Sequence, residues 1–148
     1  MSLTVQEYAA NIAEKQAEKL LAAANAVPQD KWNWKPLDRG RSVVSQLAEC
    51  AVINGGLPSI LRDRGWTGST EDFQAAMAAF DTPEKVSAAL LESTQLMAAA
   101  IRAVPDDQLA IDVVMPWATF TMAELLLLPY WNMSYHEGQI TSIETLCG

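Results

Sequence analysis

Four points in this chain carry residues that start an α-helix, and apolar residues at helical spacing follow each of them. Thr4 to Glu7 and Thr121 to Glu124 place a hydroxyl three residues before a carboxylate, so each pair can satisfy two free N–H groups of a first turn. Ser42 precedes another apolar stretch, and Thr82 precedes a proline, which suits the first helical position. These signals predict long helices that begin near residues 4, 42, 82 and 121.

Prolines and glycines divide the remaining chain. Gly55, Gly56 and Pro58 fall inside the second helix and predict a kink or break there. Pro129 falls inside the last helix and predicts a kink about one turn before Asn132. A short helix is expected over residues 71–79, and residues 111–120 are expected to be irregular or extended. The pattern predicts an all-α fold, a four-helix bundle, antiparallel overall, with extra short helices and one long crossover.

Length, composition and charge narrow the class of protein. The chain has 148 residues, half of them hydrophobic, and no repeat or clear linker, so we expect one domain over residues 1–148. Its net charge of -8 disfavours nucleic acid and anionic lipid as partners. No apolar run is long enough to span a bilayer, and the N-terminus does not resemble a signal peptide. Two widely separated cysteines fit a reduced compartment, so we expect a cytoplasmic protein.

The only histidine, His136, lies in the predicted last helix, four residues after Asn132. Residues at this spacing share one face of a helix. The two side chains therefore form a candidate polar site, and the question is what completes it.

The chain resembles the DinB-like (DinB/YfiT-type) family of four-helix bundles over nearly its whole length. The resemblance rests on Trp34-Lys35-Pro36 before the second helix, the Ser-Val-x-x-x-Leu-Ala opening at 42–48, Pro116-Trp117, and His-x-Gly-Gln at 136–139. Their order and spacing together imply a bundle of this family, and the resemblance also implies a homodimer.

Family members typically place three histidines around a divalent metal, one from the second helix and two from the last. The matching positions here are Glu49, Asn132 and His136, of which only His136 keeps the histidine. The resemblance implies a mixed N/O site for Zn, Ni, Mn or Fe. The alternative is that no metal binds, and that Asn132 and Glu49 hydrogen-bond to His136 as a buried polar cluster.

Two further groups of residues have competing interpretations. Cys50 with His136 could form a nucleophilic pair, although a buried structural cysteine is the commoner case. Trp34, Trp117 and Trp131 could line a ligand pocket beside His136, although tryptophans at such positions more often belong to the core.

Two functions from different classes follow. The resemblance implies a metal-dependent enzyme related to thiol S-transferases and isomerases, in which a metal would activate a bound thiol or water. The alternative is a non-catalytic, metal-free bundle that binds a small ligand or serves as a dimeric structural protein. Loss of the histidine pair favours the second function, and the sequence identifies neither a substrate nor a catalytic residue.

Overall fold

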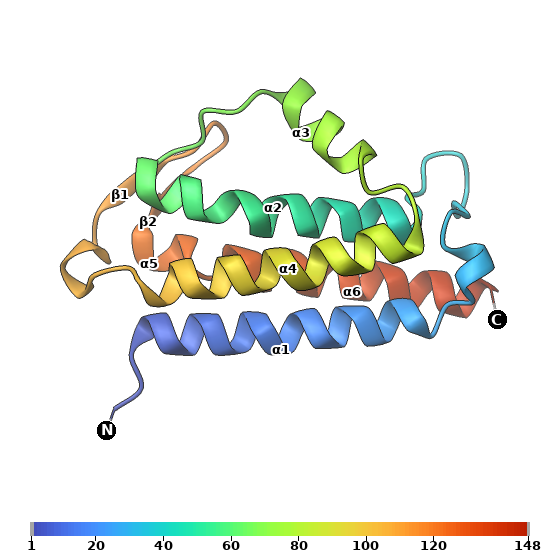
Figure 1. The fold of residues 1–148 in the computed structure, drawn as a ribbon, viewed down its shortest axis with the longest axis horizontal. Coiled ribbons are helices and arrows are strands. Elements are labelled where there is room, and N and C mark those ends of the chain that lie inside the picture. The colour runs from blue at the N-terminus through green and yellow to red at the C-terminus, as the bar shows by residue number, and fades with distance from the viewer. Residues whose placement is uncertain (1, 148) are drawn as a thin grey trace.

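Four long helices dominate the fold of the computed structural model, which describes residues 2–147 (Figure 1). They are α1 (Val5–Asn25), α2 (Val43–Asp63), α4 (Pro83–Arg102) and α6 (Leu128–Cys147). Two shorter helices, two single 3-10 turns and a two-stranded hairpin connect them: α3 (Thr70–Ala78), α5 (Met122–Leu125), Gln29–Lys31, Asp106–Gln108, β1 (Asp112–Val114) and β2 (Thr119–Thr121). The all-α prediction is confirmed, and the segment expected to be extended forms the hairpin.

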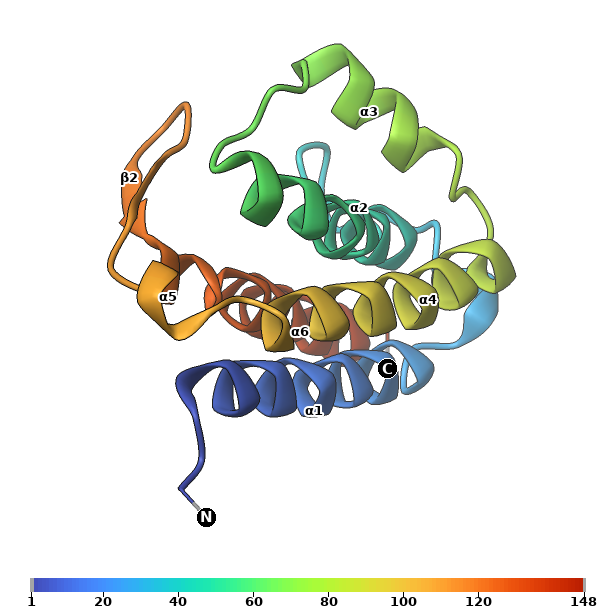
Figure 2. The ribbon, with the colours of Figure 1, turned by 60° about the vertical axis from the view of Figure 1, so that its left-hand side comes forward.

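The long helices form a four-sided bundle in which α2 and α1 each pack against both α4 and α6. The expectation of an antiparallel arrangement is wrong for two pairs of helices. Figures 1 and 2 show α2 and α4 running in the same direction, and α1 and α6 likewise. The segment 64–82, which contains α3, is the long crossover that returns the chain to the starting end of α2. Helix α3 lies outside the bundle and packs on α2, so it forms an additional layer over that helix.

The helix starts follow the predicted chemistry, with two changes. Thr4 Oγ1 accepts from Glu7 N at 3.1 Å, and Thr82 accepts in the same way at the start of α4. The second half of the capping box predicted at Thr4 does not form, because the Glu7 carboxylate pairs with Arg102 at 3.2 Å. Thr121 and Glu124 form both halves of a capping box, but this box opens the short α5 rather than the last long helix. α6 begins only at Leu128, so Pro129 occupies its first turn. The helix expected to kink at Pro129 is instead interrupted at residues 126–127, because the proline has no N–H to continue the hydrogen bonding of α5.

Helix α2 continues through Gly55, Gly56 and Pro58, so the predicted break does not occur. Leu57 and Leu61 are buried on the same stretch, and their packing outweighs the weak helix propensity of the glycines. The short helix begins at Thr70 with Ser69 as its cap, one residue earlier than expected. Within residues 2–147, no helix combines the length and the apolar character needed to cross a membrane.

Candidate functional site

His136 is buried where α6 faces α2, and both of its ring nitrogens contact oxygen atoms from α2. Nε2 lies 2.5 Å from Glu49 Oε2, and Nδ1 lies 2.8 Å from Gln46 Oε1. Gln46 and Glu49 are three residues apart, so they project from the same face of α2 toward α6. The Gln46 amide is oriented by a second contact, because its Nε2 donates to the backbone oxygen of Arg41 at 3.3 Å.

Arg41 approaches the same carboxylate from the end of α2. It precedes Ser42, the N-cap of the helix, and its Nη1 lies 2.7 Å from Glu49 Oε2. Its Nη2 also donates to Ser45 Oγ at 3.0 Å, which fixes the guanidinium along the first turns of the helix. The hydrogen bond from His136 is the largest effect on Glu49, and together with Arg41 it outweighs burial and lowers the pKa of Glu49 to about 2.

Asn132 lies close to the cluster but does not join it. Its Nδ2 donates to Cys50 Sγ at 3.6 Å, and the predicted hydrogen bond from Asn132 to His136 is therefore wrong. Gln46 takes that role instead, and the sequence reasoning missed it. The available signal was the spacing of Gln46 and Glu49, which places both on the face of α2 that carries the family's histidine position.

The three predicted metal ligands do not fit a metal as they are arranged. Glu49 and His136 meet, whereas Asn132 is hydrogen-bonded to neither of them within residues 2–147 and its Nδ2 donates to Cys50. A ligating histidine must offer a nitrogen lone pair, whereas both nitrogens of His136 face oxygen acceptors. The Glu49 oxygen that contacts His136 is also paired with the guanidinium of Arg41. Across residues 2–147, no three His, Cys, Asp or Glu side chains are grouped so that they could hold a metal ion.

Cys50 does not pair with His136. Its side chain is buried, its only side-chain hydrogen bond within residues 2–147 is from Asn132, and no disulfide forms. Burial, reinforced by the neighbouring charge of Glu49, raises the pKa of the Cys50 thiol far above its usual range. A thiol held protonated in this way is a poor nucleophile, so the structural interpretation of Cys50 agrees with its surroundings.

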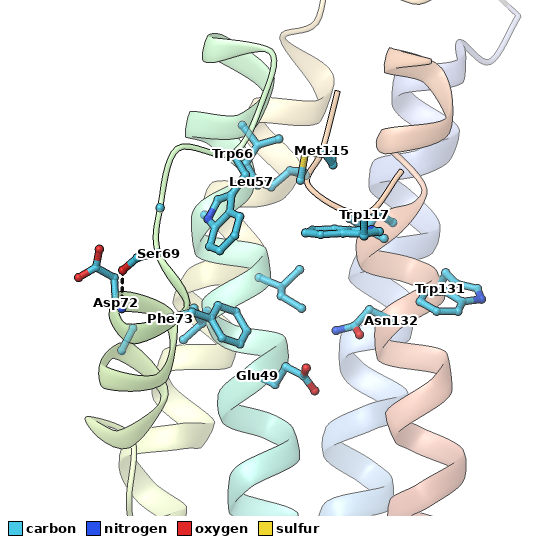
Figure 3. Close-up of a pocket in the computed structure, with 17 residues that line it drawn as sticks. Glu49, Leu57, Trp66, Ser69, Asp72, Phe73, Met115, Trp117, Trp131 and Asn132 are labelled. Carbon is cyan, nitrogen blue, oxygen red and sulfur yellow. Dashed lines mark hydrogen bonds between the residues drawn. The ribbon is translucent and has the colours of Figure 1, made fainter. Parts of the chain in front are cut away.

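An apolar pocket of about 500 Å³ opens beside the polar cluster, between α2, α3, the hairpin and α6 (Figure 3). Glu49 and Asn132 lie at one end of it, with Glu49 lowest in the view and Asn132 between Glu49 and the ring of Trp117. His136 contacts Glu49 but is not part of the lining. The other lining residues are Val52, Ile53, Gly56, Leu57, Ile60, Gly68, Ser69, Asp72, Ala76, Met115, Leu128 and Trp131.

The tryptophans divide between pocket, surface and core differently from the sequence prediction. Trp117 and Trp131 line the pocket and are more than half exposed, whereas Trp34 lies in a loop away from it. The fully buried tryptophan is Trp32, whose Nε1 donates to Val27 O at 3.0 Å. Trp66 was missed, although it lies in the loop just after α2, and it meets Trp117 with ring centroids 6.4 Å apart.

Solved structures with this fold include those of two other proteins. A mutant of a mycothiol-dependent maleylpyruvate isomerase superposes with a TM-score of 0.77 at 15% identity, over 93% of this chain and 61% of the isomerase. A protein from Streptococcus pneumoniae superposes with a TM-score of 0.75 at 14% identity, over 98% of this chain and 93% of that protein. The chain thus spans about three fifths of the isomerase, and at these identities the likeness shows the fold alone.

Among curated proteins, no sequence matches this chain significantly. The sequence pattern of the DinB superfamily, however, matches residues 12–140. That range includes Arg41, the cluster on α2 and α6, and every residue that lines the pocket. This chain is therefore a member of the DinB superfamily.

Proposed function

We propose that this protein is a metal-free binding domain for a small apolar molecule, held in the pocket between α2, α3, the hairpin and α6. The observation that carries the proposal is the contact between Arg41 and Glu49 at 2.7 Å. The guanidinium supplies the positive charge that a metal would bring to this carboxylate. A metal would have to displace Arg41 from Glu49 and deprive His136 of a hydrogen-bond acceptor.

The pocket has the size and lining of a small-molecule site. Its volume of about 500 Å³ is in the range of drug-sized ligand sites, which are mostly apolar with few polar groups. Apolar and aromatic side chains form most of the walls, and the polar residues Glu49 and Asn132 gather at one end. The contacts of Arg41, Gln46 and His136 hold Glu49 in one position, so this end is preorganised before a ligand arrives.

Metal-dependent thiol chemistry is the competing function, because the fold is shared with a mycothiol-dependent isomerase. It requires a metal at Glu49 and His136, and elemental analysis after dialysis against Zn, Ni, Mn and Fe(II) separates the two functions. Metal near one equivalent that is lost in His136→Ala would refute the metal-free proposal. Homodimer formation remains a prediction from the family resemblance, and light scattering of the purified protein tests it.

Gly56 offers a direct test of the pocket. It lies on α2 and lines the pocket, and a Cβ added there meets no atom within 4 Å. Gly56→Leu should therefore fill the pocket while improving helix propensity. Gly138 on α6 has the same open surroundings but lies outside the lining, so Gly138→Leu is the matched control.

The binding assay uses Nile red, an uncharged apolar dye, in the presence of EDTA. We expect the wild-type protein and Gly138→Leu to bind the dye with similar affinity. The affinity of Gly56→Leu for the dye should be at least about tenfold lower. Thermal unfolding of the three proteins confirms that each is folded. Equal binding by all three would refute the proposed pocket, and binding that disappears with EDTA would refute its metal-free character.

A further inference from the structure

We infer that the pocket selects an uncharged apolar molecule with one hydrogen-bond donor, such as a hydroxyl or amide N–H, and that Arg41 sets this choice. The inference rests on the proposed function, because it names the chemistry of the ligand in the same pocket. It also gives a role to Arg41, which lies outside the lining and acts through Glu49.

The polar end of the pocket has oxygen acceptors to which no group of the described residues donates a hydrogen bond. Both contacts of Glu49 use Oε2, and no donor from residues 2–147 is hydrogen-bonded to Oε1. Asn132 uses its Nδ2 for Cys50, and its Oδ1 likewise accepts nothing from the described part of the chain. A ligand that reaches Glu49 and Asn132 therefore meets two free oxygen acceptors, which require a donor on the ligand, and the second N–H of the Asn132 amide, to which the oxygen of a hydroxyl or amide can accept.

An anionic ligand does not suit this end. No Lys, Arg or His lines the pocket, and its charged lining residues are Glu49 and Asp72. Figure 3 shows the carboxylate of Asp72 turned away from the cavity, whereas that of Glu49 lies on the side facing Asn132. A carboxylate or phosphate group would lose its hydration and face the acceptor oxygen of Glu49, which is repulsive.

A cationic ligand gains little here. The charge of Glu49 is already compensated by Arg41 at 2.7 Å, and the same oxygen contacts His136 at 2.5 Å. An ammonium group would have to leave water to approach a carboxylate that is already paired, with the guanidinium close by. A neutral hydroxyl or amide N–H can donate to Glu49 with a much smaller loss of hydration.

The test compares three compounds that share one apolar body: phenylbutanol, phenylbutylamine and phenylbutyrate. Calorimetric titrations with EDTA present give their affinities for the wild-type protein. We expect the alcohol to bind at least about tenfold more tightly than the amine and the carboxylate. Arg41→Met removes the charge that compensates Glu49, so the affinity ratio of amine to alcohol should rise by at least about tenfold.

Two variants control for the substitution itself. Arg39→Met makes the same change in net charge at an exposed position outside the polar cluster and should keep the wild-type ratio. Arg41→Lys retains the charge and should keep the alcohol preferred. Urea unfolding of each variant shows whether the fold is retained.

Failure of this inference is distinguishable from failure of the proposed function. If Nile red binds and Gly56→Leu abolishes its binding, but the alcohol is not preferred or Arg41→Met leaves the ratio unchanged, the ligand class is wrong and the pocket stands. If neither Nile red nor any of the three compounds binds, the proposed function fails and this inference fails with it.

Discussion

Arg41 holds the carboxylate of Glu49 from a position eight residues earlier, just before the helix that carries Glu49. Two helical turns advance the chain by roughly 11 Å, a distance that the side chains of Arg41 and Glu49 span together when they extend toward each other along the helix. The contact puts a fixed cation next to the position that matches a family metal ligand. Under the proposed function Arg41 opposes metal binding at Glu49, and variants of Arg41 and Asn132 test this.

Restoring a histidine should create metal affinity only when Arg41 is also removed. We expect Arg41→Ala/Asn132→His to take up about one equivalent of Zn or Ni, because Glu49 would be released from the guanidinium and a second imidazole would join Glu49 and His136. Equilibrium dialysis followed by elemental analysis measures this uptake.

The control is Asn132→His alone, in which Arg41 still occupies Glu49. It should bind metal at least about tenfold more weakly than the double variant. Equal metal affinity of the single and the double variant would show that Arg41 does not oppose metal binding.

Gln46 and His136 should be energetically coupled. Removing either partner leaves a buried polar group without its hydrogen bond, so His136→Ala should lower the free energy of unfolding by about 2–4 kcal/mol and Gln46→Ala by about 1–2 kcal/mol. In a double-mutant cycle measured by urea unfolding, the loss in the double variant should fall short of the sum by about 1 kcal/mol or more. Strict additivity would mean that the 2.8 Å contact contributes nothing to stability.

The sequence predicted the bundle because its helix starts are local signals. Thr4, Thr82 and the Thr121–Glu124 pair all form the predicted caps, since each needs only residues of its own first turn. The differences from prediction concern prolines and glycines. Pro129 lies in a first turn and the glycines of α2 are held by packing, and neither circumstance can be read without knowing where α6 starts and what α2 contacts.

Only those parts of the site that follow from residue positions along a helix could be predicted from the sequence. Glu49 and His136 were named from the family positions, and the structure brings them together. The parts that were missed come from tertiary contacts: Gln46 meets His136 across two helices, and Trp66 joins Trp117 through two loops that are distant in sequence. Asn132 was assigned to His136 because both share a face of α6, yet its amide reaches Cys50 on the opposing helix.

The two cysteines should differ strongly in reactivity. Cys50 is buried and its thiol is held protonated, whereas Cys147 is partly exposed at the end of α6. With a chromogenic disulfide reagent, the thiol of Cys147 should react at least about tenfold faster than that of Cys50 in the folded protein, and both should react quickly in urea. Cys147→Ser should remove the fast phase. A fast phase that persists in this variant would show that Cys50 is accessible and reactive.

Acid should weaken the fold through Glu49. Its pKa falls from 4.5 to about 2 in the folded protein, because His136 and Arg41 donate to the ionised carboxylate. A lowered pKa means that the stabilisation is complete above pH 4.5 and is lost as the pH falls from 4.5 toward 2. The loss should be about 2 kcal/mol, allowing for partial exposure of the carboxylate to solvent.

Glu49→Gln keeps the shape of the side chain and removes its titration. The difference in the free energy of unfolding between wild type and this variant should therefore shrink as the pH falls from 4.5 toward 2. Urea unfolding between pH 2 and 6 measures both proteins, and carboxylates elsewhere, such as Asp81 beside Lys85, cancel in the comparison. A difference that stays constant across the range would mean that the ionised form of Glu49 contributes nothing to stability.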